Sequence, residues 1–353
     1  MFPHTHSTAQ NLKLDATSPP SSDRITGAGV GLRMPHIGEL LADADAEQPH
    51  LDIPWVELLA DNWLAPSNQP LGGINRELLG AVAERFALTL HGVGLSLGSC
   101  GELSIPYLQK IKQLHRDTGA QWYSEHCSFS WEGQRQHYAP DLLPLPYTDE
   151  AVMLLAQHIR QVQDYMGEPL LLENVSSYVQ YQHSQLSEVE FINAVLSEAD
   201  CLLLLDINNV YVTSFNETTA HCEQLRNASP HEQHAQRAES LEHAKKFLRQ
   251  VPHKRVQEIH LAGHEAIERD GHHFLLDTHN QAIATDVWDL YNNYIAEQGP
   301  RATLIEWDSD LPPLAQLDDE RRNAQRILDE NASKTQTPQA QFSQVSSAEA
   351  RAT

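Results

Sequence analysis

The chain has 353 residues, with 48 acidic and 24 basic side chains and a formal net charge of −24. This negative charge is spread along the chain and would repel nucleic-acid phosphates and anionic lipids, so neither nucleic acid nor membrane is expected as a partner. No stretch approaches the ~20 apolar residues of a membrane-spanning helix.

The two ends of the chain differ from its middle in composition. Residues 1–24 and 331–353 are rich in Ser, Thr, Pro and Gln, which predicts a disordered leader and a disordered tail. The leader lacks the apolar segment of a signal peptide. The four cysteines form no CxxC pair, which indicates reduced thiols and a cytoplasmic protein. Residues 25–330 are predicted to form a single domain.

Within this domain, short apolar runs alternate with amphipathic ones. Strands are predicted at 27–33, 55–60, 87–92, 121–126, 169–174, 201–207, 256–263 and 302–308. Helical patterns follow them, at 75–86, 105–117, 149–166, 187–199, 239–251, 285–298 and 312–330. Near-continuous apolar strands that alternate with helices predict a parallel sheet covered on its faces, and eight such units predict a (β/α)8 TIM barrel.

The third to the eighth predicted strands all end in polar side chains that can bind metals or protons. In chain order these are His91, Glu125 with His126, Glu173 with Asn174, Asp206 with Asn208 and Asn209, His260, and Glu306. The active site of a TIM barrel lies where the carboxyl ends of its strands converge, so these side chains are expected to meet. Asp277 and His279, in the loop after the seventh strand, are expected on the same face.

These side chains together predict a metal site, although each one alone is more often an ordinary polar residue. A buried, unpaired carboxylate costs several kcal/mol, so cations are expected among them. Imidazole and carboxylate ligands without cysteine suit iron, manganese or zinc. The nine candidate ligands are His91, His126, Glu173, Asp206, Asn209, His260, Asp277, His279 and Glu306. One ion usually takes three or four protein ligands, so this number implies two or three ions.

The segment EIHLAGH, residues 258–264, holds two histidines four positions apart. On a helix this spacing is typical of zinc sites, but the residues favour a strand that ends at Gly263. His260 is then a ligand, and His264 is expected just outside the metals as an orienting or proton-transfer group. Glu125 and Asn174 are further candidates for that outer role.

Several ordered motifs resemble those of the multinuclear non-heme iron-dependent oxidative enzymes. This family includes the oxidase of methanobactin biosynthesis and was long described as a domain of unknown function. The motifs are LHGVGLSLGS (90–99), SEHCSFS (124–130), DLLPLPYTDEA (141–151), LLENVSSY (171–178), LLLDINNVYV (203–212), EIHLAGH (258–264), DTH (277–279) and TLIEWDSDLPPL (303–314). The resemblance covers about residues 25–330.

The resemblance implies a TIM barrel that holds two or three iron ions (Fe2+/Fe3+) and uses O2 as co-substrate. It implies oxidation of cysteine residues in a ribosomally synthesised precursor peptide. It also implies a partner protein, encoded nearby, that presents this peptide. The products differ among members of the family.

Two other functions compete with a peptide oxidase. The order of the ligands also resembles the three-zinc endonuclease IV barrel, and sugar isomerases such as xylose isomerase share this architecture, so a metal-dependent hydrolase or isomerase is the alternative. Asn209 stands where the nuclease has histidine, and the net charge of −24 does not suit duplex DNA. A metal-dependent peptide-binding protein without turnover is the third hypothesis.

Overall fold

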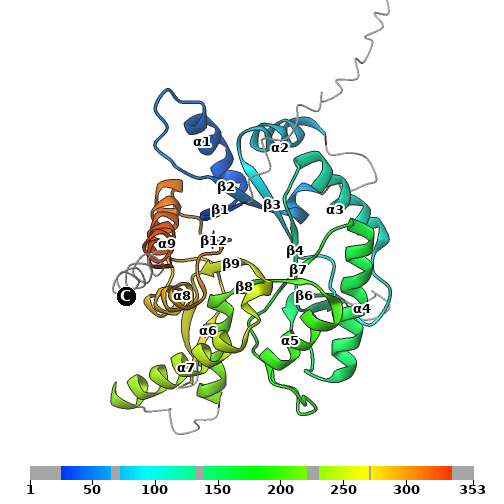
Figure 1. Cartoon of the computed structure of the whole chain (residues 1–353), viewed down its shortest axis with the longest axis vertical. Helices are drawn as coiled ribbons and strands as arrows, with labels where there is room; N and C mark the ends of the chain where they lie inside the picture. Colours follow the sequence, from blue (N-terminus) through cyan, green and yellow to red (C-terminus); the bar gives the residue numbers. More distant parts are fainter. Residues whose placement is uncertain (1–24, 65–71, 132–137, 221–229, 270–271, 336–353) are drawn as a thin grey trace, which may run out of the picture.

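Eight parallel strands form a closed barrel at the centre of the molecule (Figure 1). The computed structural model describes residues 25–64, 72–131, 138–220, 230–269 and 272–335. The barrel order is β1-β12-β9-β8-β7-β4-β3-β2. The strands are β1 Ala28–Leu32, β2 Trp55–Leu59, β3 Ala87–Gly92, β4 Tyr123–His126, β7 Leu171–Glu173, β8 Leu202–Asp206, β9 Val256–Ala262 and β12 Ala302–Glu306. Each lies within a predicted strand, and the predicted TIM barrel is confirmed.

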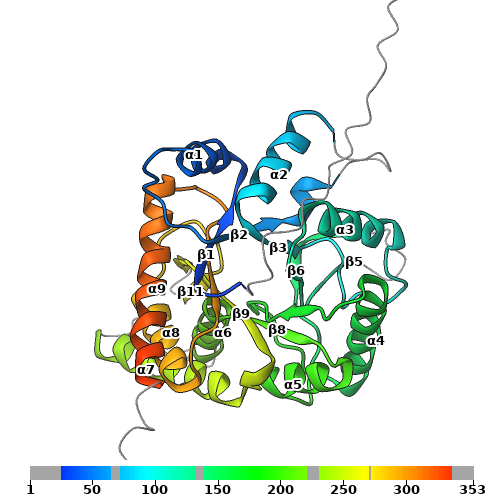
Figure 2. The same cartoon turned by 45° about the horizontal axis from the view of Figure 1, so that its top comes forward.

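Helices surround the barrel, as the turned view in Figure 2 shows. They are α1 Met34–Ala44, α2 Gly73–Arg85, α3 Ile105–Thr118, α4 Asp149–Met166, α5 Glu188–Ala199, α6 Ile207–Ala220, α7 Pro230–Gln250, α8 Thr285–Gln298 and α9 Leu314–Thr335. Short 3-10 helices η1 Ala60–Trp63 and η3 His253–Arg255 follow β2 and precede β9. The seven helices predicted from the sequence are present.

Local capping explains where several helices begin and end. Thr148 accepts a hydrogen bond from the backbone N–H of Ala151 at the start of α4, and Ser187 and Glu190 form a capping box at the start of α5. Gly119 and Gly167 end α3 and α4 in the left-handed conformation that glycine adopts without steric cost.

Sequence patterns did not reveal α1, α6 or two hairpins. Helix α6 begins directly after Asp206, whose Oδ1 accepts the backbone N–H of Asn209 at 2.7 Å as a helix cap. Its sequence INNVYVTSFNETTA is rich in β-branched residues, whose low helix propensity does not predict a helix. The antiparallel hairpins are β5 Phe129–Trp131 with β6 Tyr138–Leu143, and β10 Glu265–Arg269 with β11 His272–Leu276.

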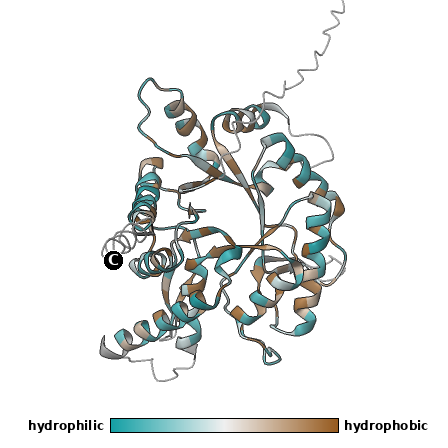
Figure 3. Cartoon of the chain, viewed as in Figure 1, coloured by the Kyte–Doolittle hydropathy of each residue, from teal (hydrophilic) through white to brown (hydrophobic). Residues whose placement is uncertain are grey.

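The barrel interior changes from apolar to polar along its strands. Its amino-terminal end is filled by buried apolar side chains that include Trp55, Trp122 and Leu204. Buried Glu57 and Glu258 follow, and the histidines and carboxylates at the strand ends come last. A larger apolar core packs the outside of the strands against the helices, which are amphipathic in Figure 3. Helical packing therefore stabilises the barrel, and its open end is free to carry polar groups.

The predicted domain end at residue 330 lies inside α9, which continues to Thr335 with Asn331 buried. The predicted leader at 1–24 and residues 336–353 of the predicted tail lie outside the described residues. Among the described helices, none has the length and apolar character needed to cross a membrane. Cys100, Cys127 and Cys201 are free thiols, and Cys127 is buried; Cys222 lies outside the described residues.

Candidate metal centre

Strand alternation sends one set of polar side chains into the barrel at its carboxyl end. Side chains two positions apart share a face of a strand, so His91 follows Thr89 inward, and His260 follows Glu258. All nine candidate ligands are buried or nearly buried. Seven of them fall into three overlapping clusters, and His260 also belongs to a fourth group with Glu57 and Glu258.

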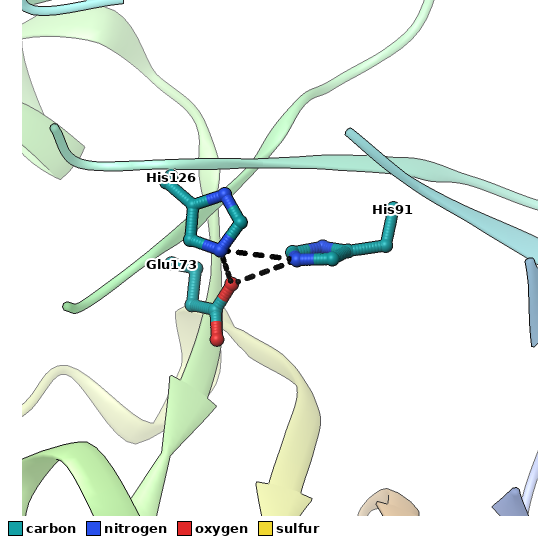
Figure 4. A group of neighbouring side chains, drawn as sticks. All are labelled: His91, His126 and Glu173. Carbon is teal, nitrogen blue, oxygen red and sulfur yellow. Dashed lines mark hydrogen bonds and ion pairs between the residues drawn. The ribbon is translucent and has the colours of Figure 1, made fainter. Parts of the chain in front are cut away.

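The first cluster is formed by His91, His126 and Glu173 from β3, β4 and β7 (Figure 4). The Nε2 atoms of both histidines lie 3.2 Å from each other and 3.2 Å from Oε2 of Glu173. Ligands of a tetrahedral ion with 2.0–2.1 Å bonds lie about 3.3–3.4 Å apart, which is close to this spacing. Nδ1 of His126 donates to the carbonyl of Gly92 and Nδ1 of His91 contacts Ser124 Oγ, so both Nε2 atoms face the centre.

The second cluster consists of Glu173, Asp206, His260 and Glu306. Nδ1 of His260 lies 3.0 Å from Oε2 of Glu306 and 3.7 Å from Oε1 of Glu173. Glu173 therefore belongs to both clusters, with one oxygen toward each. A carboxylate in this position can bridge two ions.

The third cluster lies nearer the surface and joins His279, Glu306 and Asp308. Nδ1 of His279 is 3.4 Å from Glu306 and 3.2 Å from Asp308, and its Nε2 is 2.7 Å from Asp277. Asp308 also pairs with buried Arg33. His279 has a positive φ of 47°, so its loop is held in an unusual conformation. Asp308 was not predicted as a ligand, although it follows Glu306 by two positions.

Two asparagines fix the ends of β7 and β8 beside the clusters. The side chain of Asn174 donates a hydrogen bond to the carbonyl of Asp206 and accepts one from the backbone N–H of Asp206, each at 2.9 Å. These two bonds join the strands. Asn209 donates to the carbonyl of Asn174 at 3.0 Å, and its buried Oδ1 has no hydrogen-bond partner in the described part of the chain. Asn209 also lines the cavity over the clusters.

Glu125 and His264, which were predicted together with Asn174 for an outer or catalytic role, do not line this cavity. Glu125 lies on β4 and is buried on the outer face of the barrel, where its carboxylate accepts hydrogen bonds from the Tyr123 hydroxyl and the Leu95 N–H. His264 follows the end of β9 and contacts Oδ1 of Asn208 through Nδ1 at 2.7 Å, and Asn208 donates to Asp277 at 2.7 Å. His264 is thus three contacts away from the clusters, through Asn208 and Asp277 to His279.

Two buried carboxylates below His260 were missed by sequence reasoning. Glu57 Oε1 and Glu258 Oε1 lie 3.4 and 3.7 Å from Nε2 of His260. Their other oxygens accept hydrogen bonds from Thr89 Oγ1 and Trp122 Nε1. Each is an acidic residue within an otherwise apolar strand, in WVELL and VQEIH, and this pattern could have predicted buried carboxylates inside the barrel.

The unsatisfied atoms of the clusters fit the binding of metal ions. In the described chain, Oε2 of Glu173 and Oδ2 of Asp206 are buried and have no hydrogen-bond partner. Buried carboxylates also outnumber the buried arginine beside them, Arg33. Two histidines and a carboxylate are a donor set typical of non-heme iron and also of catalytic zinc. The residues present therefore fit the ions that the sequence predicts.

Burial shifts the pKa of several of these groups in the metal-free protein. It raises the pKa of Glu173 to about 8 and those of Asp206 and Glu57 to about 7. For His126, burial is outweighed by the carboxylates of Glu173 and Glu125, and its pKa rises to about 9. Burial would likewise raise the pKa of Glu306, but nearby His279 and His260 lower it to about 2.

These shifts predict that the metal-free protein loses stability as the pH rises from about 6 to 8. The raised carboxyl groups keep protons in the folded state that the unfolded state has already released, so the free energy of unfolding falls by at most about 1.4 kcal/mol per group and pH unit. His126, also raised, acts in the same direction. Melting temperatures after chelation would test this. Bound metal should remove the loss, and a chelated protein that melts higher at pH 8 than at pH 6 would contradict it.

A cavity of about 240 Å³ opens over the clusters. Its lining includes the side chains of His91, His126, Glu173 and Glu306, together with the apolar groups Leu59, Val93, Leu142 and Val175. Ser176, Tyr178 and Asp277 close one side, where the Ser176 hydroxyl donates to Asp277. The cavity therefore offers a substrate both metal ligands and apolar contacts.

Comparison with known sequences gives a clear family match. A family model described as "RiPP precursor modification enzyme MbnB/TglH/ChrH" matches residues 27–329. Proteins named UPF0276 from Vibrio vulnificus and Acaryochloris marina are 38% and 40% identical over 300 and 304 residues. These matches cover 85% and 86% of this chain, and 91% and 95% of the relatives.

Similar solved structures include a D-allulose 3-epimerase from Methylomonas sp. and the IOLI protein with a bound zinc atom. Their sequences are 14% and 11% identical to this chain, with TM-scores of 0.46 and 0.47. Both alignments cover 88% of this chain, and 97% and 99% of the solved chains.

Proposed function

Because the chain belongs to the MbnB/TglH/ChrH family of RiPP precursor modification enzymes, we propose that it oxidises cysteine residues of a ribosomally synthesised precursor peptide with O2 and iron. The family match agrees with the resemblance seen in the sequence motifs. One observation carries the proposal: Glu173 belongs to two adjacent clusters. The first also contains His91 and His126, and the second contains Asp206, His260 and Glu306. This donor set suits two neighbouring iron ions.

The proposed roles follow from the contacts. His91, His126 and Glu173 would hold one ion, and Glu173, Asp206, His260 and Glu306 would hold a second. His279, Glu306 and Asp308 would form a third site, with Asp277 beside His279 and Asn209 in the lining of the same cavity. When bound, the iron would supply electrons to O2 and bind the substrate thiolate. The protein's part is to position these ions beside a cavity with apolar walls.

We assign His264 an orienting role rather than proton transfer. Its only route to the clusters in the described structure passes through the carboxamide of Asn208 to Asp277, and a carboxamide does not readily relay protons. Burial lowers the pKa of His264, which favours the neutral ring as a fixed hydrogen-bond partner. Glu125 would support His126 from outside the barrel.

The proposed substrate is a cysteine-containing peptide, presented by a partner protein that is encoded nearby, in the cytoplasm. Protein purified without oxygen should contain at least about one iron per chain. Co-expression with a neighbouring small gene for a cysteine-containing peptide should change the mass of that peptide. The reaction of the purified enzyme with the peptide should require O2.

A peptide with serine in place of cysteine and a reaction under nitrogen are the controls. Stoichiometric zinc with little iron, and turnover without O2, would instead indicate a hydrolase or isomerase. Peptide affinity without any mass change would indicate a binding protein. Either result would reject the oxidase.

A further inference from the structure

A second cavity, of about 300 Å³, lies beside the metal centre. It is bounded by the start of α5, one face of α6 and the end of α7. Hydrogen bonds frame it: the Ser177 N–H donates to Thr213 Oγ1 on α6, and Asn193 on α5 donates to the carbonyl of Gln250 on α7. These hydrogen bonds hold the walls of the cavity in place.

Residues 175–180 lie between this cavity and the one over the metals. Ser176 and Tyr178 line the metal cavity, whereas Ser177 and Val179 line the second cavity. Tyr178 and Val179 are also among the exposed large apolar side chains, at 46% and 51%. A peptide that crosses this segment could therefore contact an apolar ridge and place side chains in both cavities.

Among the described residues, one carboxylate of the second cavity, that of Glu188, has no partner. Glu217 accepts a hydrogen bond from Gln180 and lies 3.6 Å from His243. The carboxylate of Glu188 forms no hydrogen bond or ion pair with another described residue, and Lys246 of the same lining is not paired with it. Burial, with Glu217 nearby, raises the pKa of Glu188 to about 8, so a cation would be needed to keep it charged at neutral pH.

The remaining lining offers apolar surface against which the methylene chain of a long side chain can pack. Leu145, Val189 and Phe247 contribute apolar surface, and Tyr147 lies close to them. Lysine and arginine bury their methylene chains against such surfaces and keep the charged group at a polar end. A neutral apolar side chain would leave Glu188 unpaired.

We propose that this cavity binds a lysine or arginine side chain of the same precursor peptide whose cysteine reaches the metal centre. The inference rests on the proposed function for the identity of the ligand. About three residues of extended peptide, roughly 10 Å, would pass over residues 175–180 from one cavity to the other. The basic residue is therefore expected about three positions from the cysteine.

Binding of short synthetic peptides to the metal-loaded protein, measured without O2 by fluorescence anisotropy, tests the proposal. Each peptide would carry one cysteine and one lysine at a varied spacing, and a matched peptide would carry norleucine in place of the lysine. At the best spacing, norleucine should weaken binding to the wild-type protein by about tenfold. In Glu188→Gln the two peptides should bind almost equally.

Glu198→Gln is the matched control, because Glu198 is on the same helix, is exposed and lies outside the cavity. This variant should retain the full preference for lysine. Equal binding of both peptides by wild-type protein at every spacing, or an unchanged preference in Glu188→Gln, would overturn the proposal.

The binding assay also distinguishes this inference from the proposed function, because it requires no turnover. Oxidation of a peptide without any preference for lysine would reject only the basic-residue site. A preference for lysine that depends on Glu188, in a protein that never changes the peptide mass under O2, would support the site and reject the oxidase.

Discussion

Replacing Glu173 by glutamine should remove metal from two sites at once. Oε2 of Glu173 lies 3.2 Å from both His91 and His126, and Oε1 faces His260 at 3.7 Å. Glutamine keeps the size of the side chain but removes the charge that both clusters share. Loss of outer partners of a metal ligand costs about 10–100-fold in affinity, so loss of a shared ligand should exceed about 100-fold at each site.

Metal content per chain and chelator competition measure this effect. His126→Gln should affect only the first cluster and Asp206→Asn only the second, so each should retain metal that Glu173→Gln loses. The metal-free Glu173→Gln protein should melt no lower than the wild type, because the change removes a carboxyl group that burial disfavours in its charged form. Full metal content in Glu173→Gln would show that the carboxylate is not shared.

Much of the site was predictable because a parallel barrel brings the carboxyl ends of its strands together. His91, Glu173, Asp206, His260 and Glu306 come from five different strands, and sequence position alone placed them on one face. The alternation within β4 could not be fixed in the same way, since Glu125 and His126 are neighbours with similar chemistry. The structure sends His126 inward and Glu125 outward.

Contacts between residues that are distant in the sequence could not be predicted. Arg33 follows the first strand and Asp308 the last, and they meet only because β1 and β12 pair to close the barrel. Gly263 was expected to end its strand, and β9 does end at Ala262. The structure gives a further reason for glycine at this position: a Cβ at Gly263 would overlap the carbonyl oxygen of Gln281. The sequence did not predict that the loop of Gln281 lies against Gly263.

The buried pair Glu57 and Glu258 leads to the second prediction with a large effect. Both carboxylates face Nε2 of His260, while Nδ1 of the same ring faces Glu173 and Glu306. We expect a carboxylate below the ring to favour a proton on Nε2, which would leave the Nδ1 lone pair directed at Glu173 and Glu306. The sequence predicted His260 as a ligand but did not predict the two carboxylates that face its Nε2.

Glu57→Gln should therefore lower metal affinity at the second cluster by about 10–100-fold and leave the first cluster loaded. The carboxamide can donate to Nε2, which would move the ring proton to Nδ1 and block the ligand atom. Chelator competition on the purified variant measures this loss. The metal-free variant should melt at the same temperature or higher, since burial raises the pKa of Glu57 to about 7 and makes its charged form costly.

Glu258→Gln distinguishes control of the tautomer from a general effect of charge. It removes the same charge, but Glu258 lies farther from Nε2, at 3.7 Å against 3.4 Å, and its other oxygen is held by Trp122. If Glu57 fixes the tautomer, its substitution should cost more affinity than that of Glu258. Equal losses would mean that charge alone matters, and normal affinity in both variants would mean that the pair does not act on the metal through His260.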